Sequence, residues 1–113
     1  MNLEKEAKGE FAISTEQDVK PVIYIVSDSI GETAELVARA AASQFNHGGV
    51  EIRRIPYVSD PEEIPEIVEE ASAFNSIIAY TVVVAELKER IVREAAKYGI
   101  PTVDIMTPMI DAL

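Results

Sequence analysis

Four short apolar runs, each followed by an amphipathic segment, limit the folds open to this 113-residue chain. The runs are rich in β-branched residues, which is typical of strands buried on both faces. The segments between them repeat apolar residues every three or four positions, the period of a helix that buries one side. Strands that alternate with helices across short loops predict a parallel sheet covered on both faces. We expect the strands over residues 22–27, 50–57, 76–83 and 101–106.

The first run, VIYIV at 22–26, is apolar throughout and therefore belongs at the centre of the sheet. With right-handed crossovers, this placement predicts a strand order of 2-1-3-4, counted along the chain. The fold class is α/β, an open parallel four-stranded sheet with helices on both faces, of Rossmann or flavodoxin-like type. Adjacent Arg53 and Arg54 are typical of an edge strand protected by charge, which we favour over the alternative that one of them reaches a phosphate or a partner protein. Residues 21–113 make one domain, and residues 1–20 are expected to be a flexible arm.

Capping residues mark the expected starts of the first two helices. The first is predicted over 31–45, with Ser29 and Glu32 matching a capping box. Asp60 is the expected N-cap of the second helix, and Pro65 predicts an irregular first turn. The buried stripe predicted for the first helix consists of Ala34, Val37, Ala38, Ala41 and Phe45.

The last two helices also have clear sequence signals, one for the end of the third helix and one for the start of the fourth. The third is expected to end at Gly99, because glycine suits the left-handed position after a helix. Thr107 as cap and Pro108 in the first turn predict a further helix. That helix has only just begun at Leu113, so either its last turn packs as it is or the chain is the N-terminal part of a longer protein, which is the interpretation we favour.

The composition argues against several classes of function. A net charge of −10 argues against non-specific binding to nucleic acid or to an anionic membrane. No window approaches the roughly 18 apolar residues of a membrane-spanning helix, and the N-terminus lacks the apolar stretch of a signal peptide. Cysteine is absent and His47 is the single histidine, a predicted solvated turn residue, so we expect no disulfide and no metal site. The predicted location is the cytoplasm.

The stretch VSDSIGETAE at 26–35 holds the main candidate site. Ligands of open parallel sheets bind beyond the carboxyl ends of the strands, where free helix N–H groups and the helix dipole attract anions. A glycine there lets a phosphate oxygen approach the backbone. The predicted phosphate-binding or ligand-binding residues are Ser27, Ser29, Gly31, Glu32 and Thr33, with Tyr80 and Thr81 at the end of the third strand.

Asp28 distinguishes two interpretations of this stretch. A carboxylate repels phosphate unless a metal ion or a transferring proton mediates between them, so Asp28 is either a catalytic group or a hydrogen-bonded part of the loop. We take it as the catalytic candidate. The competing interpretation is that Ser29 and Glu32 simply cap a helix.

Six segments in order resemble the N-terminal part of one protein family, the bacterial and plant regulatory proteins of pyruvate, phosphate dikinase and phosphoenolpyruvate synthase. They are YIVSDSIGETAELVARAA, VEIRRIPYV, IVEEA, AYTVV, GIPTVDIM and PMIDAL, and they span roughly residues 22–113. The resemblance implies an ADP-dependent serine/threonine kinase that inactivates the dikinase or the synthase. It also implies the reverse activity, a phosphorylase that uses inorganic phosphate and releases pyrophosphate. ADP and phosphate would be ligands of the complete parent, with no cofactor in this chain alone.

The chain departs from that family in two ways. The family loop usually reads Ser-Asp-Ser-Thr-Gly-Glu-Thr, and Ile30 replaces its threonine here. The family's glycine-rich phosphate loop with a lysine lies beyond the end of this chain, and no G-x-x-x-x-G-K-[ST] pattern occurs. Because positioning and charge neutralisation supply most of phosphoryl-transfer catalysis, we expect the fragment alone to be inactive without its C-terminal domain. A homodimer is compatible with the sequence.

A flavodoxin-like module that binds FMN phosphate is the alternative function. Ser27, Ser29, Gly31 and Thr33 have the spacing of a flavodoxin phosphate loop, at the same place in the same type of fold. The absence of tryptophan, the four expected strands and Asp28 beside the phosphate argue against it.

Overall fold

The computed structural model describes residues 5–7, 9–10, 20–45 and 49–113, and its main sheet has four parallel strands. Their order is β4-β3-β5-β6, which is the predicted 2-1-3-4. A separate antiparallel pair joins β1 (Lys5–Ala7) and β2 (Gly9–Glu10). The four main strands are β3 (Val22–Val26), β4 (Glu51–Ile55), β5 (Ser76–Tyr80) and β6 (Thr102–Asp104).

The central position of β3 follows from its sequence. All five of its residues are buried, and it pairs in parallel with β4 on one side and β5 on the other. Because side chains alternate along a strand, Tyr24 and Val26 face one layer while Ile23 and Ile25 face the other. Both edges of β3 and both of its faces are therefore occupied, as a continuous apolar run requires.

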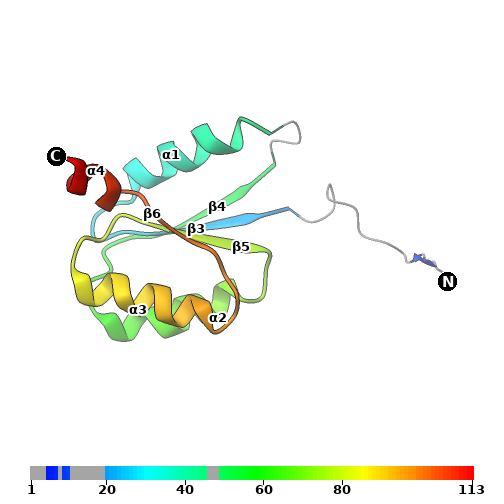
Figure 1. Cartoon of the computed structure of the whole chain (residues 1–113). Coiled ribbons are helices and arrows are strands. Elements are labelled where there is room, and N and C mark those ends of the chain that lie inside the picture. Colours follow the sequence, from blue (N-terminus) through cyan, green and yellow to red (C-terminus); the bar gives the residue numbers. More distant parts are fainter. Residues whose placement is uncertain (1–4, 8, 11–19, 46–48) are drawn as a thin grey trace.

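Helices lie on both faces of the sheet (Figure 1). The 3-10 turn η1 leads into α2 on one face, where α3 lies beside α2, and α1 and α4 occupy the opposite face. The larger core cluster lies on the α2–α3 side, and the smaller one lies under α1. The bounds are α1 (Glu32–Ala42), η1 (Pro61–Glu63), α2 (Ile64–Ala71), α3 (Ala85–Ala96) and α4 (Thr107–Ala112).

The buried stripe of α1 is narrower than predicted. Ala34 and Ala38 are buried against the sheet, but Ala41 is exposed. Val37 is 44% exposed and Phe45, beyond the end of the helix, is 71% exposed. The two buried residues lie four apart, on one line along the helix, and the rest of the predicted stripe has no described neighbour that covers it.

Two of the predicted caps are confirmed, at Asp60 and Gly99, and two are wrong, at Ser29 and Thr107. Asp60 accepts a hydrogen bond from the Glu62 amide (2.9 Å) and forms a capping box with Glu63, and the following turn is 3-10 as the proline at 65 led us to expect. Gly99 has the left-handed φ of 68° expected after α3. Thr107 does not cap α4, because Asp104 at the end of β6 supplies that acceptor.

Other predictions have mixed outcomes. β4 lies at one edge of the sheet, as the adjacent arginines suggested. The expected strands over 50–57 and 76–83 are shorter at their carboxyl ends, because the chain there turns into loops that contact the candidate site. His47 lies outside the described residues, as do most residues of the expected arm.

Candidate functional site

Ser27 organises the loop that follows β3. Its side chain is 1% exposed, and its Oγ accepts hydrogen bonds from the Ser29 amide (3.0 Å) and from Thr81 Oγ1 (3.2 Å). The Ser29 hydroxyl lies 3.3 Å from the same oxygen. The structure therefore brings together Ser27, Ser29 and Thr81, three of the residues predicted for the site.

The N-terminus of α1 has no side-chain cap, so the predicted capping box of Ser29 and Glu32 is wrong. Gly31 is the N-cap, with a left-handed φ of 87°. Upstream of this glycine, the Ser29 amide donates to Ser27 Oγ and is therefore not free to join a capping box. The first helical hydrogen bond runs from the Glu35 amide to the Gly31 carbonyl oxygen (3.2 Å). The exposed first turn, at Glu32 and Thr33, therefore presents helix N–H groups that no side chain of the described residues satisfies.

Asp28 is exposed at the top of this loop. Among the residues that the structure describes, none donates a hydrogen bond to its carboxylate or forms an ion pair with it. The carboxylate is therefore not a staple of the described loop, and it is accessible to a group bound beside the α1 N-terminus.

A second loop, from β4 to η1, holds the first one in place. The Val58 amide donates to the Ser27 carbonyl oxygen (2.8 Å), and the Tyr57 amide donates to that of Ser29 (2.9 Å). Tyr57 has a φ of 58°, which is left-handed and uncommon for a residue that is not glycine. Its side chain is 65% exposed. Sequence reasoning missed this residue, because no local pattern predicts a tyrosine in that conformation.

Arg54 connects β4 to the start of α1, although the sequence favoured edge protection over a place in the site for it. Its guanidinium forms an ion pair with Glu35, and Nη1 donates to the Ile30 carbonyl oxygen (3.3 Å). Hydrogen bonds from Arg54 and then from Arg39 hold the pKa of Glu35 below its ordinary value. A positive charge therefore lies beside the loop, although Glu35 largely neutralises it.

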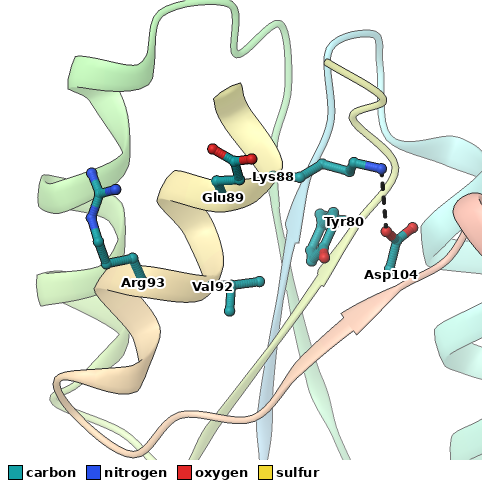
Figure 2. Close-up of a pocket in the computed structure, with 6 residues that line it drawn as sticks. All are labelled: Tyr80, Lys88, Glu89, Val92, Arg93 and Asp104. Carbon is teal, nitrogen blue, oxygen red and sulfur yellow. Dashed lines mark ion pairs between the residues drawn. The ribbon is translucent and has the colours of Figure 1, made fainter. Parts of the chain in front are cut away.

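Tyr80 and Thr81 are adjacent in sequence, but their side chains lie in two different parts of the structure. The Thr81 side chain joins the loop at Ser27, whereas Tyr80 lines a cavity of about 420 Å³ on the α3 side of the sheet. Figure 2 shows this cavity, with Lys88 and Val92 from α3 and Asp104 from β6. The remaining lining residues are Glu89 and Arg93.

Asp104 links this cavity to α4. Its Oδ1 accepts hydrogen bonds from the amides of Met106 (3.2 Å) and Thr107 (2.9 Å), and Oδ2 lies 3.9 Å from Lys88 Nζ. Burial opposes the charged form, but the hydrogen bonds from Thr107 and the charge of Lys88 outweigh it, so the pKa of Asp104 is lowered. Burial and then the Asp104 carboxylate raise the pKa of Tyr80. Both groups keep their ordinary charge near neutral pH.

The carboxyl edge of the sheet thus carries an exposed helix N-terminus without a side-chain cap, an exposed carboxylate and a mixed-charge cavity. Across residues 5–7, 9–10, 20–45 and 49–113, no group of three histidine, aspartate or glutamate side chains could hold a metal ion. Within the same residues, no helix has the length and apolar character needed to cross a bilayer. The groups that the described residues place at this edge, helix N–H donors, hydroxyls and the Asp28 carboxylate, can form hydrogen bonds and transfer protons.

Comparison with known proteins assigns the chain to a family. A family profile described as kinase/pyrophosphorylase matches residues 23–113, which contain the whole α/β domain from β3 onward. The chain belongs to the kinase/pyrophosphorylase family. The matched segment includes the complete Ser27–Thr33 loop and the cavity around Tyr80.

Several relatives with assigned names agree with that membership. A pyruvate, phosphate dikinase regulatory protein 2 from Syntrophomonas wolfei is 55% identical over 92 residues, which is 81% of this chain and 34% of the relative. Proteins named as pyruvate, phosphate dikinase regulatory proteins also come from Carboxydothermus hydrogenoformans and Desulfitobacterium hafniense. The Carboxydothermus protein is 48% identical over 90% of this chain, which is 37% of its own length. The Desulfitobacterium protein is 53% identical over 82% of this chain, which is 34% of its own length. The chain thus spans about a third of the length of the curated relatives it matches.

Proposed function

We propose that this chain is the N-terminal part of a regulatory enzyme that phosphorylates pyruvate, phosphate dikinase with ADP and removes that phosphate with inorganic phosphate. The observation that carries the proposal is membership of the kinase/pyrophosphorylase family over residues 23–113. The names of the relatives favour the dikinase over phosphoenolpyruvate synthase as the partner. Family membership also favours this function over FMN-dependent electron transfer. The proposed location is the cytoplasm, where such a partner would be reached.

The loop from Ser27 to Thr33 supplies one half of the proposed phosphate site. The first-turn amides of α1 point away from the helix and carry its positive dipole end, which attracts a phosphoryl oxygen. The left-handed Gly31 sets the backbone turn that starts the helix, and a Cβ there would face Ile25 and Arg54. The hydroxyls of Ser29 and Thr33 would add donors, and buried Ser27 would fix the loop from below.

Asp28 is the proposed proton carrier. In the kinase direction its carboxylate would take the proton from the protein hydroxyl as that oxygen attacks the phosphoryl group. In the reverse direction a phosphate oxygen attacks the phosphoryl group, and the proton returns to the leaving hydroxyl. Exposure without a described hydrogen-bond partner supports this role, because the carboxylate is not committed to holding the loop.

The second half of the site would come from the C-terminal part of the parent. One uncapped helix end supplies roughly 0.3–1 kcal/mol of electrostatic attraction at an exposed position, and a few hydrogen bonds add to it. That is too little to bind ADP tightly or to neutralise a transferring phosphoryl group. We therefore expect the 113-residue chain alone to leave the dikinase unmodified when it is incubated with ADP.

A chimera tests the function. Residues 23–113 replace the matching third of the Syntrophomonas wolfei relative, and phosphorylation of pyruvate, phosphate dikinase with ADP is followed by mass spectrometry. Asp28→Asn should lower the rate about 100-fold or more, the loss typical of a missing general base, while the circular dichroism spectrum stays unchanged. Glu66→Gln on the far face is the matched control and should keep the parental rate. If Asp28→Asn instead unfolds the protein and the folded fraction is fully active, Asp28 is a structural residue and the proposed mechanism is wrong.

A further inference from the structure

The sheet face that α1 covers remains open above β5 and β6. Ala79 belongs to the core cluster under α1, and Val103 pairs with it in register, so Val103 lies on the same face. Ala79 is 4% exposed, whereas Val103 is 46% exposed. Ile77, two residues before Ala79 on β5, shares that face and is half-buried. The cover over this face therefore ends between β5 and Val103 of the outer strand β6, although Ile105, just beyond that strand, packs against the cluster under α1.

The orientation of α1 shows which of its sides borders the open area. Glu35 forms an ion pair with Arg54 of β4, so the Glu35 side of the helix is turned toward β4. At 100° per residue, Val37 lies on the other side of the buried line through Ala34 and Ala38. Val37 is thus turned toward β5 and β6, and it is 44% exposed.

Val37, Ile77 and Val103 form what we term the open apolar surface. It is uncharged, and α4 lies on the same side of the sheet with Met109 65% exposed and Ile110 47% exposed (Figure 1). Parallel sheets are found almost only with both faces covered, because their strands are apolar on both sides. The opposite face meets this rule with α2 and α3, and the face above β6 does not.

We propose that the open apolar surface is the docking site for an amphipathic helix from the part of the parent protein outside the matched third. The inference rests on the proposed function in one respect, because both require that this chain is part of a longer parent protein. Two thirds of each relative lie outside the matched region, with 34% covered in one and 37% in another. The docked helix would present an apolar stripe with residues every three or four positions to Val37, Ile77 and Val103.

A second copy of the same chain suits this surface less well. Two copies would bring together chains of net charge −10 each, and their mutual repulsion opposes association. A helix of the same parent chain is covalently linked to this domain. Its high effective concentration offsets charge repulsion in a way that a separate copy cannot.

The experiment compares one substitution in two contexts, the 113-residue chain and the Syntrophomonas wolfei chimera described above. Val103→Asp should shift the Tm of the 113-residue chain by about 3 °C or less, because an exposed side chain changes little on substitution. In the chimera the same substitution should lower the Tm by about 5 °C or more, since the carboxylate would be buried under the docked helix. Val92→Asp is the matched control, because Val92 is also 46% exposed but lies on α3 beside the cavity of Figure 2. It should give a small shift in both contexts.

Several results would overturn the inference. Equal shifts for Val103→Asp in the two contexts mean that nothing covers the surface in the longer protein. A large shift for Val92→Asp alone moves the docking site to the α3 side. Light scattering that shows the 113-residue chain as a dimer, dissociated by Val103→Asp, makes a second copy the occupant. If the chimera does not fold, substitution of the residue aligned with Val103 in the unmodified relative decides the question. The Tm requires no activity, so an inactive chimera with the expected shift refutes the proposed function and leaves the docking site standing.

Discussion

Replacement of Gly31 by alanine tests whether the site loop depends on a left-handed backbone. Gly31 has a φ of 87°, a conformation that costs an L-residue about 1–2 kcal/mol. Alanine also restricts the unfolded chain, which returns about 0.4–1 kcal/mol. The space itself adds little, because a Cβ at this position would lie 3.4 Å from Ile25 Cγ2 and 3.5 Å from Arg54 Cδ, within ordinary contact. The expected net loss of unfolding free energy is therefore about 1 kcal/mol.

Gly99 offers a matched control on the same chain. Its φ is 68°, and a Cβ there would meet nothing within 4 Å. If conformation and not crowding determines the cost, Gly99→Ala and Gly31→Ala should lose the same unfolding free energy to within about 0.5 kcal/mol. Gly31→Asn should lose less than Gly31→Ala, because asparagine tolerates the left-handed region better.

Urea unfolding followed by far-ultraviolet circular dichroism measures these differences. With an m-value of about 1 kcal/mol/M, typical of a small domain, Gly31→Ala should lower the midpoint by about 1 M while m stays constant. An alanine variant as stable as the parent would refute the assigned backbone conformation. A loss at Gly31 about 2 kcal/mol greater than at Gly99 would show that packing against Ile25 and Arg54, and not φ, makes glycine necessary.

Two further predictions concern the networks around the edge strand β4. Tyr24→Phe should lower the unfolding free energy by about 1–2 kcal/mol. The reason is that the Tyr24 hydroxyl donates to Glu70 (3.0 Å) and accepts from Arg53 (3.0 Å). An unchanged urea midpoint would contradict this. The lowered pKa of Glu35 means that its pairing stabilises the fold above the ordinary glutamate pKa of 4.5 and is lost as the pH falls through the folded value. A carbon-13 NMR titration should show Glu35 ionising below 4.5, and Arg54→Gln should raise its pKa; no change in that variant would remove Arg54 as the cause.

Much of the fold follows from patterns that are local in sequence. The continuous apolar run of β3 predicts a strand with neighbours on both sides, and its place between β4 and β5 confirms this. Asp60 is the N-cap that was predicted, and it forms a capping box with Glu63, which lies within one turn of it. Such features depend on nearest neighbours, which a sequence displays directly.

The errors arise where distant residues compete with local ones. Ser29 matched a capping pattern, but its amide donates to the buried Ser27 hydroxyl, and the helix begins only after the left-handed Gly31. Thr107 matched a cap as well, but Asp104 from β6 supplies the acceptor and Lys88 from α3 donates to the threonine hydroxyl (2.9 Å). The choice between these partners is made by tertiary packing.

The candidate site shows the same limit. Ser27, Ser29 and Thr81 were predicted and do come together, because parallel strands align their carboxyl ends. Tyr57 was not predicted, since its left-handed backbone is imposed by hydrogen bonding across two loops. The exposed side of α1 at Val37 was also missed, because a helical stripe predicts a buried face only if something lies against all of it.

The measurement that tests the central claim most directly is a phosphate titration of the isotope-labelled 113-residue chain, followed by amide NMR. The account predicts weak, saturable shifts, with a Kd on the order of 1 mM or weaker, at the amides from Ser29 to Thr33. The amides that begin α3, from Ala85 onward, have no side-chain cap either and serve as the internal control, which should shift far less. Shifts at Ala85 equal to those at Gly31, or none at either place up to high phosphate, would contradict a phosphate site at the loop after β3.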